Sequence, residues 1–115
     1  MKLRDDPGEK IVVQTTELPW QPSDAPGVER RMLWRDDASG LATSVVRYAP
    51  GASYPGHTHS GGEEILVLEG TFADEHGVYP AGTYLRNPPG SAHHPYSPDG
   101  CLLFVKLGHL GKASS

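Results

Sequence analysis

One stretch decides the fold, His57-Thr58-His59-Ser60-Gly61-Gly62-Glu63. Two imidazoles stand two residues apart, a carboxylate follows four residues later, and His93 lies thirty residues beyond it in a Pro/Gly-rich segment. Residues i and i+2 of a strand point to the same side, so His57 and His59 can share a face. Three imidazole nitrogens and one carboxylate oxygen can close around one divalent first-row metal ion. The pattern therefore predicts a metal held inside a β-barrel.

The size and composition indicate a single globular domain. The chain has 115 residues, of which 37% are hydrophobic and 21% are charged. This length supports one modest core, and the composition is that of a folded rather than a disordered protein. The 14 glycines and 11 prolines are spread along the whole chain. Such a spread favours many turns between short strands.

Charge and hydropathy exclude several classes of function. The net charge is -4 and no basic stripe is present, which argues against nucleic-acid binding. No run of about 18 apolar residues exists that could span a membrane, and the first residues contain no apolar signal-peptide core. The single cysteine, Cys101, cannot form an internal disulfide, which fits a reducing compartment. We therefore expect a cytoplasmic protein.

The order of apolar and turn-forming segments predicts an all-β chain with little or no helix. We expect a flexible N-terminal arm over residues 1–9, a β-barrel over 10–110 and a tail over 111–115. No segment of a dozen residues has a strong helical period. Turns are expected at 19–27, 35–40, 74–77 and 87–90. Strands are expected at 10–18, 28–34, 41–48, 64–69, 71–73, 83–86 and 101–107.

The alternation around Glu63 predicts which side chains face the interior. Glu63 is in phase with Ile65 and Val67, so these three should point into the barrel. Leu66 and Leu68 should then point outward, where paired apolar side chains are typical of an interface. We therefore expect a homodimer, in which the strand at 10–18 can join the sheet of the partner.

Two motifs in this sequence resemble those of the cupin superfamily. The first runs from Gly51 through His57, His59 and Glu63 to Gly70, with the family's internal spacings. The second runs from Gly82 through Pro88, Gly90 and His93, and Ser97 stands where the family has asparagine. The motifs cover residues 51–70 and 82–97. The wording around them, including His-Thr-His-Ser-Gly-Gly-Glu-Glu and Arg-Asn-Pro-Pro-Gly, is similar to the cupin domain of ChrR-type anti-sigma factors.

This resemblance implies a single-domain, RmlC-like jelly-roll β-barrel that binds one divalent metal per chain. It implies His57, His59, Glu63 and His93 as the ligands. Glu64 is an alternative to Glu63, since the family tolerates three or four intervening residues. No Cys-x2-Cys is present for the zinc-binding, sigma-capturing domain of ChrR-type factors, so anti-sigma activity is not implied.

Other reactive or aromatic side chains are interpreted more simply. We expect His94 to point away from His93, His76 to be solvated in a hairpin turn and His109 to lie past the last strand. Cys101 is expected to be a packed strand residue rather than a nucleophile. Trp20 should pin its loop to the barrel. Either Arg47 or Tyr48 can line the pocket, and the strand phase alone does not decide which.

The ligand set is compatible with two classes of function. Zinc in a structural site is usually tetrahedral, so four protein ligands would close the site and give a metal-binding module that responds to a small molecule. Iron(II) or manganese usually takes six ligands, which leaves two positions for a substrate and O2. The resemblance supplies that alternative, a dioxygenase that cleaves C–C bonds of diketone-like or other enolisable small molecules, since related short cupins include such enzymes. The sequence leaves the metal open between zinc, iron, manganese and nickel, and leaves catalysis open as well.

Overall fold

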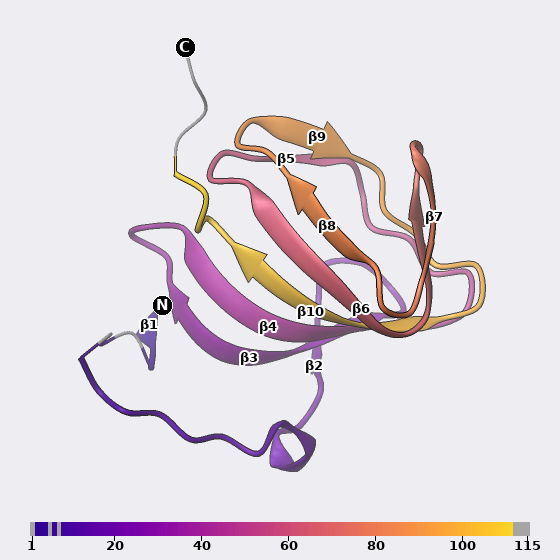
Figure 1. Cartoon of the computed structure of the whole chain (residues 1–115). Helices are drawn as coiled ribbons and strands as arrows, with labels where there is room; N and C mark the ends of the chain where they lie inside the picture. Colours follow the sequence, from indigo (N-terminus) through magenta and orange to yellow (C-terminus); the bar gives the residue numbers. More distant parts are fainter. Residues whose placement is uncertain (1, 5, 7, 112–115) are drawn as a thin grey trace.

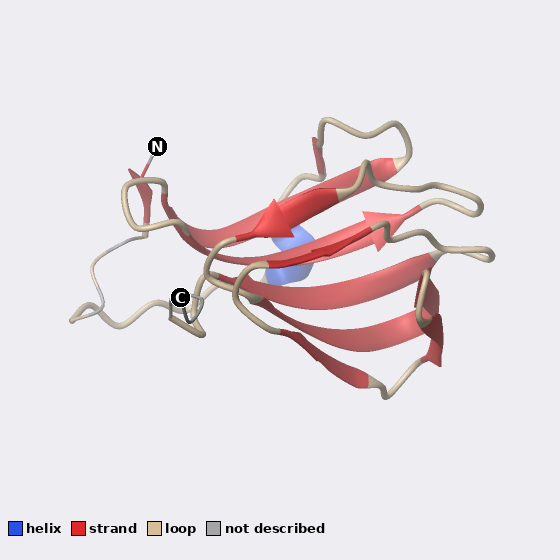
Figure 2. Cartoon of the chain, turned by 90° about the horizontal axis from the view of Figure 1, so that it is seen from above, coloured by secondary structure: helices blue, strands red, loops and turns tan. Residues whose placement is uncertain are grey.

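A computed structural model describes residues 2–4, 6 and 8–111, with the backbone alone described for Lys2 and His57. Strands dominate the chain, and the helical structure among these residues is one short 3-10 turn, η1 (Figure 2). None of the described helical structure is long and apolar enough to cross a membrane. The elements in chain order are β1 Lys2–Leu3, η1 Thr15–Glu17, β2 Gln21–Pro22, β3 Val28–Asp36, β4 Leu41–Tyr48, β5 His57–His59, β6 Glu63–Asp74, β7 Gly77–Pro80, β8 Tyr84–Asn87, β9 Ser91–His93 and β10 Cys101–Leu107.

The strands form two antiparallel sheets. The larger has eight strands in the order β1-β3-β4-β10-β6-β7, with β2 paired to β3 and β8 paired to β6. The smaller is the pair β5-β9, which lies across from β3 and β4 (Figure 1). The last strand, β10, lies between β4 and β6, so the middle of the large sheet is formed by strands that are distant in the sequence. The predicted all-β jelly-roll architecture is confirmed.

The hydrophobic core lies on the inner face of the large sheet. Along β6 the exposed fraction alternates: Ile65 is 2% exposed and Val67 1%, whereas Leu66 is 38% and Leu68 42% exposed. The predicted inward and outward phases of this strand are therefore confirmed. The buried residues of the core come from β3, β4, β6 and β10 and from the preceding loop, and they are Ala25, Val28, Tyr48, Ile65, Val67, Phe72, Cys101, Leu103 and Val105.

The prediction of a strand at residues 10–18 is wrong. This segment contains no β-strand, and Thr15–Glu17 forms η1. Its valines and threonines have a high propensity for strands, but propensity forms a strand only where a neighbouring strand can supply hydrogen bonds. Val12 is 83% exposed, so the segment lies outside the core. The predicted joining of this segment to the sheet of a partner stays a prediction.

Trp20 fastens the loop after this segment to the outer face of the sheet, as predicted. Two guanidinium groups contact its ring, with Arg31 at 4.0 Å and Arg47 at 4.2 Å from the ring centroid. Arg31 also donates a hydrogen bond through Nε to the carbonyl oxygen of Leu18, at 2.8 Å. These cation–π contacts hold the chain ahead of β3 against the barrel.

The two ends of the chain and the strand that passes through Gly70 differ in part from the sequence-based expectations. Within the expected N-terminal arm, Lys2 and Leu3 pair with the last residues of β3. The expected strands at 64–69 and 71–73 are one strand, β6, and the hairpin turn between β6 and β7 lies at residues 75–76, as predicted. Of the expected tail, residues 112–115 lie outside the described part of the chain.

Candidate metal centre

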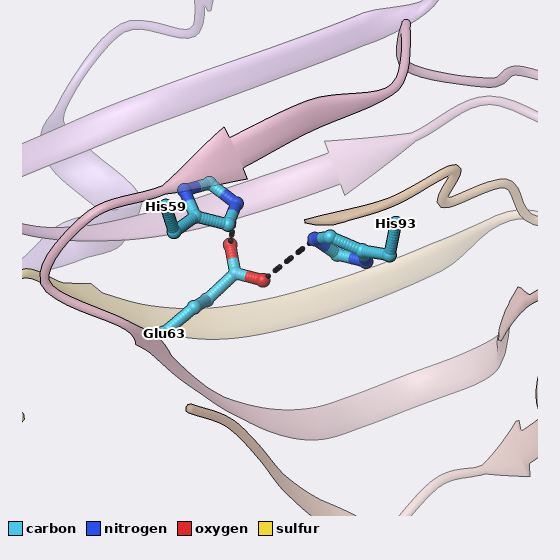
Figure 3. Close-up of side chains that lie close together, drawn as sticks. All are labelled: His59, Glu63 and His93. Carbon is cyan, nitrogen blue, oxygen red and sulfur yellow. Dashed lines mark ion pairs between the residues drawn. The ribbon is translucent and has the colours of Figure 1, made fainter. Parts of the chain in front are cut away.

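Two separate sheets bring the candidate ligands together. His59 ends β5, and His93 ends its partner strand β9. Glu63 begins β6 of the large sheet, after a turn closed by the hydrogen bond from the Gly62 N–H to the carbonyl oxygen of His59. The side chains of all three residues point toward one another (Figure 3). The short connection from β5 to β6 thus places a carboxylate opposite imidazoles of the small sheet.

The three side chains form a compact, largely buried group. Nε2 of His93 lies 3.1 Å from Oε1 of Glu63, and Nε2 of His59 lies 3.3 Å from Oε2 (Figure 3). The ligand atoms of these residues all lie within 4.8 Å of one another. Glu63 is 7% and His93 4% exposed. Each imidazole thus faces its own oxygen of one carboxylate.

The charges within this group favour an ionised carboxylate. Burial raises the pKa of Glu63, but the hydrogen bond to His93 and the charges of both histidines outweigh burial and hold its pKa below the usual value. Burial lowers the pKa of His93, and its hydrogen bond to Glu63 and the charge of that carboxylate raise the pKa above the usual value. The imidazole nitrogens and carboxylate oxygens that are paired in this group are the same atoms that a cation would bind.

The predicted fourth ligand is placed by its backbone alone. His57 begins β5 and is paired in register with His93, while the position of its side chain lies outside the described part of the structure. His57 and His59 are separated by one residue of a strand, as the sequence predicts, so the backbone gives both the same face. The geometry therefore unites three of the four predicted ligands and leaves the fourth at the adjacent register position.

The competing acidic and histidine residues lie elsewhere. Glu64 accepts a hydrogen bond from the Tyr84 hydroxyl at 2.7 Å, on the outer side of the sheet. His94 is exposed, and its backbone N–H bonds to Glu75. His76 is exposed in the hairpin turn, as predicted. Of the two carboxylates that the sequence left open, Glu63 is the one that faces the histidines.

Sequence reasoning missed the role of Asn87. This residue ends β8, directly opposite Glu63 in the pairing of β6 with β8, and its Nδ2 donates a hydrogen bond to Oε1 of Glu63 at 3.2 Å. The sequence suggested only a turn at Asn87-Pro88-Pro89-Gly90. No signal in the sequence marks the contact, because it depends on the register between two strands.

The group lies at the wall of a cavity inside the barrel. The cavity has a volume of about 190 Å³. Of the two residues that the sequence left open as pocket-lining, Tyr48 lines the cavity, whereas Arg47 points to the outer face. Burial, together with the charge of Glu63, raises the pKa of the Tyr48 hydroxyl, so that hydroxyl stays protonated. The lining residues are Ser23, Val28, Arg30, Ser44, Val46, Tyr48, Tyr54, His59, Glu63, Ile65, Phe72, His93, Pro95, Leu103, Val105 and Leu107.

Two other residues with reactive side chains are packed. Cys101 is buried in β10, as predicted, and burial raises the pKa of its thiol, which disfavours the nucleophilic thiolate. His109 packs its ring against Trp34 at 5.6 Å between centroids, so it belongs to the fold rather than to a loose tail. Neither residue is among those lining the cavity.

The donor set fits a divalent transition metal. Imidazole nitrogens and a carboxylate oxygen that converge from a buried position are the ligands that zinc, iron, manganese and nickel take in proteins. An imidazole and a carboxylate binding a cation must lose their protons, which links metal affinity to pH. The hydrogen bond from Asn87 leaves the carboxylate oriented toward the two histidines.

A family comparison covers nearly the entire chain. The model of the ChrR Cupin-like domain matches residues 8–111. The chain belongs to this family. The membership accounts for both sequence motifs and for the two sheets that face each other in the fold. No curated protein sequence matches this ChrR-like cupin significantly.

Solved structures share the fold at low sequence identity. A putative acetylacetone dioxygenase from Methylibium petroleiphilum PM1 has a TM-score of 0.78 and 18% identity, over 86% of this chain and 76% of that chain. ChrR, in its complex with SigE from Rhodobacter sphaeroides, has a TM-score of 0.70 and 23% identity, over 82% of this chain and 51% of that chain. The polyketide cyclase RemF from Streptomyces resistomycificus has a TM-score of 0.71 and 21% identity, over 88% and 81%. These likenesses establish the cupin fold, which hosts different activities.

Proposed function

We propose that this ChrR-like cupin is a metal-binding domain that holds one divalent ion with His57, His59, Glu63 and His93. The observation that carries the proposal is the convergence of two imidazoles and one buried carboxylate within 4.8 Å. A buried carboxylate is costly unless it is neutralised, and a cation removes that cost. A bound ion would also join the small sheet to the large one, since its ligands come from both.

Elemental analysis of protein expressed without added metal tests this function. We expect about one ion per chain, and we expect H59A to lose most of it, with a lower melting temperature. Loss of an ion present at 100 times its Kd removes about 2.7 kcal/mol of stability. The matched control is H76A, because His76 is an exposed histidine outside the group. H57A tests the fourth ligand. Equal metal content in H59A and H76A would contradict the ligand assignment.

The cavity favours a second candidate function, that of a metal-dependent dioxygenase. A largely apolar space next to the candidate ligands can hold a small enolisable substrate, such as a diketone, with little water around it. The fold likeness to acetylacetone dioxygenases points the same way. Bound iron(II) or manganese would supply the redox chemistry, and Tyr48 and the apolar lining would position the substrate. Oxygen uptake by iron-loaded protein with acetylacetone tests this candidate, and uptake equal to that of free iron contradicts it.

The same measurements separate the two candidates. Stoichiometric zinc with four protein ligands and no turnover supports a closed module that binds a small molecule. Iron or manganese with oxygen uptake supports the enzyme. A location in the cytoplasm is a further prediction, which rests on the single cysteine.

We also propose a homodimer that pairs through the outer face of β6. Leu66 and Leu68 are exposed there, and Tyr84 on the neighbouring strand β8 is 55% exposed. Apolar side chains grouped on one face are typical of an interface. Sedimentation equilibrium at micromolar concentration tests the proposal. A monomer would contradict it, whereas a dimer that dissociates in L66E would support this face.

A further inference from the structure

The cavity has a charged side chain at a distance from the candidate metal ligands. Arg30 lies on β3, where its neighbour Arg31 points outward to Trp20 and Arg30 itself lines the cavity. Among the described residues that line the cavity, it is the sole arginine or lysine. It makes no hydrogen bond or ion pair through its side chain with the part of the chain that the structure describes.

The surroundings of Arg30 are those of a binding group rather than a structural one. Its register partner is Val46, which is paired in turn with Leu103, and both line the cavity. A guanidinium carries five N–H donors in a planar fork that matches the two oxygens of a carboxylate. Placed beside apolar side chains and without an anionic partner among the described residues, this group is satisfied by a ligand that brings one.

Ser44 supplies a second polar group on the same side. It is 5% exposed and lines the cavity from β4, two residues from Val46. Its hydroxyl makes no hydrogen bond to any residue within the described ranges. Because strand register places Ser44 diagonally across from Arg30, the two side chains can meet the same end of a small molecule.

Strand register also sets the distance from these groups to the candidate ligands. Arg30 is level with Leu103 of β10 through their common register partner on β4, and Glu63 is the direct register partner of Leu107. Leu107 is four residues further along β10 than Leu103. Four residues of a strand span about 13 Å. The long arginine side chain shortens this distance, so one small molecule can reach from the guanidinium toward the metal group.

We propose that the cavity binds a small organic monocarboxylate. Its carboxylate pairs with Arg30 and bonds to Ser44, its apolar body lies against Val46 and Leu103, and its other end faces the candidate metal ligands. The orientation of that other end rests on the proposed metal-binding function, whereas recognition by Arg30 does not. A volume of about 190 Å³ is below that of pockets for drug-sized ligands and restricts the molecule to a few carbons. A single cation in a largely apolar lining suits one carboxylate better than a doubly charged phosphate.

The test compares an acid with its uncharged ester. The probes are 4-oxopentanoate and its methyl ester, titrated by calorimetry into zinc-loaded and metal-free protein. We expect the acid to bind more tightly than the ester. Arg30→Gln should weaken binding of the acid about 10- to 100-fold, as expected for loss of a charged hydrogen-bonded pair, and leave the ester unchanged. Arg86→Gln is the matched control, because it removes the same charge from an exposed position on β8.

Two outcomes overturn the proposal. One is equal affinity of the acid and the ester for the wild-type protein, including no binding of either at millimolar concentration. The other is unchanged affinity for the acid in Arg30→Gln. If that variant fails to fold by circular dichroism, Arg30→Lys keeps the charge without the planar fork and should lose part of the affinity. Normal metal content without preference for the acid contradicts this inference alone, whereas Arg30-dependent binding of the acid by a protein that takes up no metal contradicts the proposed function alone.

Discussion

Replacing Gly70 by alanine should destabilise the barrel more than the same change at Gly82. Gly70 has a φ of +75°, in the left-handed region. A Cβ at this position would overlap the carbonyl oxygen of Gly100 and lie 2.9 Å from Cα of Cys101. Both are backbone atoms in the turn into β10, so no side chain can rotate away to make room.

Gly82 separates the two causes of this loss. Its φ is +93°, and no atom lies within 4 Å of an added Cβ. Alanine at either position costs about 1–2 kcal/mol for the left-handed conformation. At Gly70 alone, the displaced backbone adds about 1–3 kcal/mol, the usual cost of overpacking. We therefore expect losses of about 2–5 kcal/mol for G70A and about 1–2 kcal/mol for G82A.

Urea unfolding followed by tryptophan fluorescence measures both losses, with the metal content of the variants held equal. The slope of unfolding free energy against urea should stay the same in both variants, so that the midpoints report stability. Equal losses for G70A and G82A would refute the reasoning, because they would mean that β6 does not pass against the Gly100–Cys101 backbone as described.

Three further changes test the candidate metal site, the segment that Trp20 holds against the sheet, and the β6–β7 hairpin. Asn87→Ala should lower metal affinity about 10- to 100-fold in a zinc competition assay, because Glu63 loses the donor that orients it; unchanged affinity would contradict that role. Trp20→Ala should cost about 1–2 kcal/mol of docking by the preceding segment, seen as faster proteolysis of residues 10–20, and Trp20→Phe should cost less. Burial and the hydrogen bond to Asp74 raise the pKa of Tyr79 to about 12. The neutral hydroxyl therefore adds stability that is complete below pH 10 and is lost as the pH rises through about 12, so Tyr79→Phe should flatten this alkaline decline in urea titrations.

The inner and outer faces of β6 could be predicted because side chains of a strand alternate between its two faces, and the positions of Glu63, Ile65 and Val67 follow this alternation. Glu63, Ile65 and Val67 alternate with Leu66 and Leu68, and a strand with one buried face has one compatible phase. The motif spacings likewise predicted that His59, Glu63 and His93 belong together. In these cases the local pattern and the long-range pairing agree.

The remaining features depend on contacts that no local pattern encodes. The residues at 10–18 have the composition of a strand but no strand to pair with, so propensity alone misled. Asn87 meets Glu63 through the register between β6 and β8, and Arg30 enters the cavity through the register between β3 and β4. A shift of one residue in either pairing would have put these side chains on the other face. The sequence therefore predicted the candidate metal ligands, but it did not predict the side chains, such as Asn87 and Arg30, that lie around them.

The alternation along β6 gives the protein two nearly independent routes of evolutionary change. A substitution at Ile65 or Val67 alters what the barrel can contain, and one at Leu66 or Leu68 alters what the barrel can touch. Selection on a ligand and selection on a partner can thus act on the same twelve-residue strand without interfering. An insertion or deletion of a single residue would couple them at once, since it would exchange the two faces. Divergence in this strand should therefore proceed by replacement, with its length preserved.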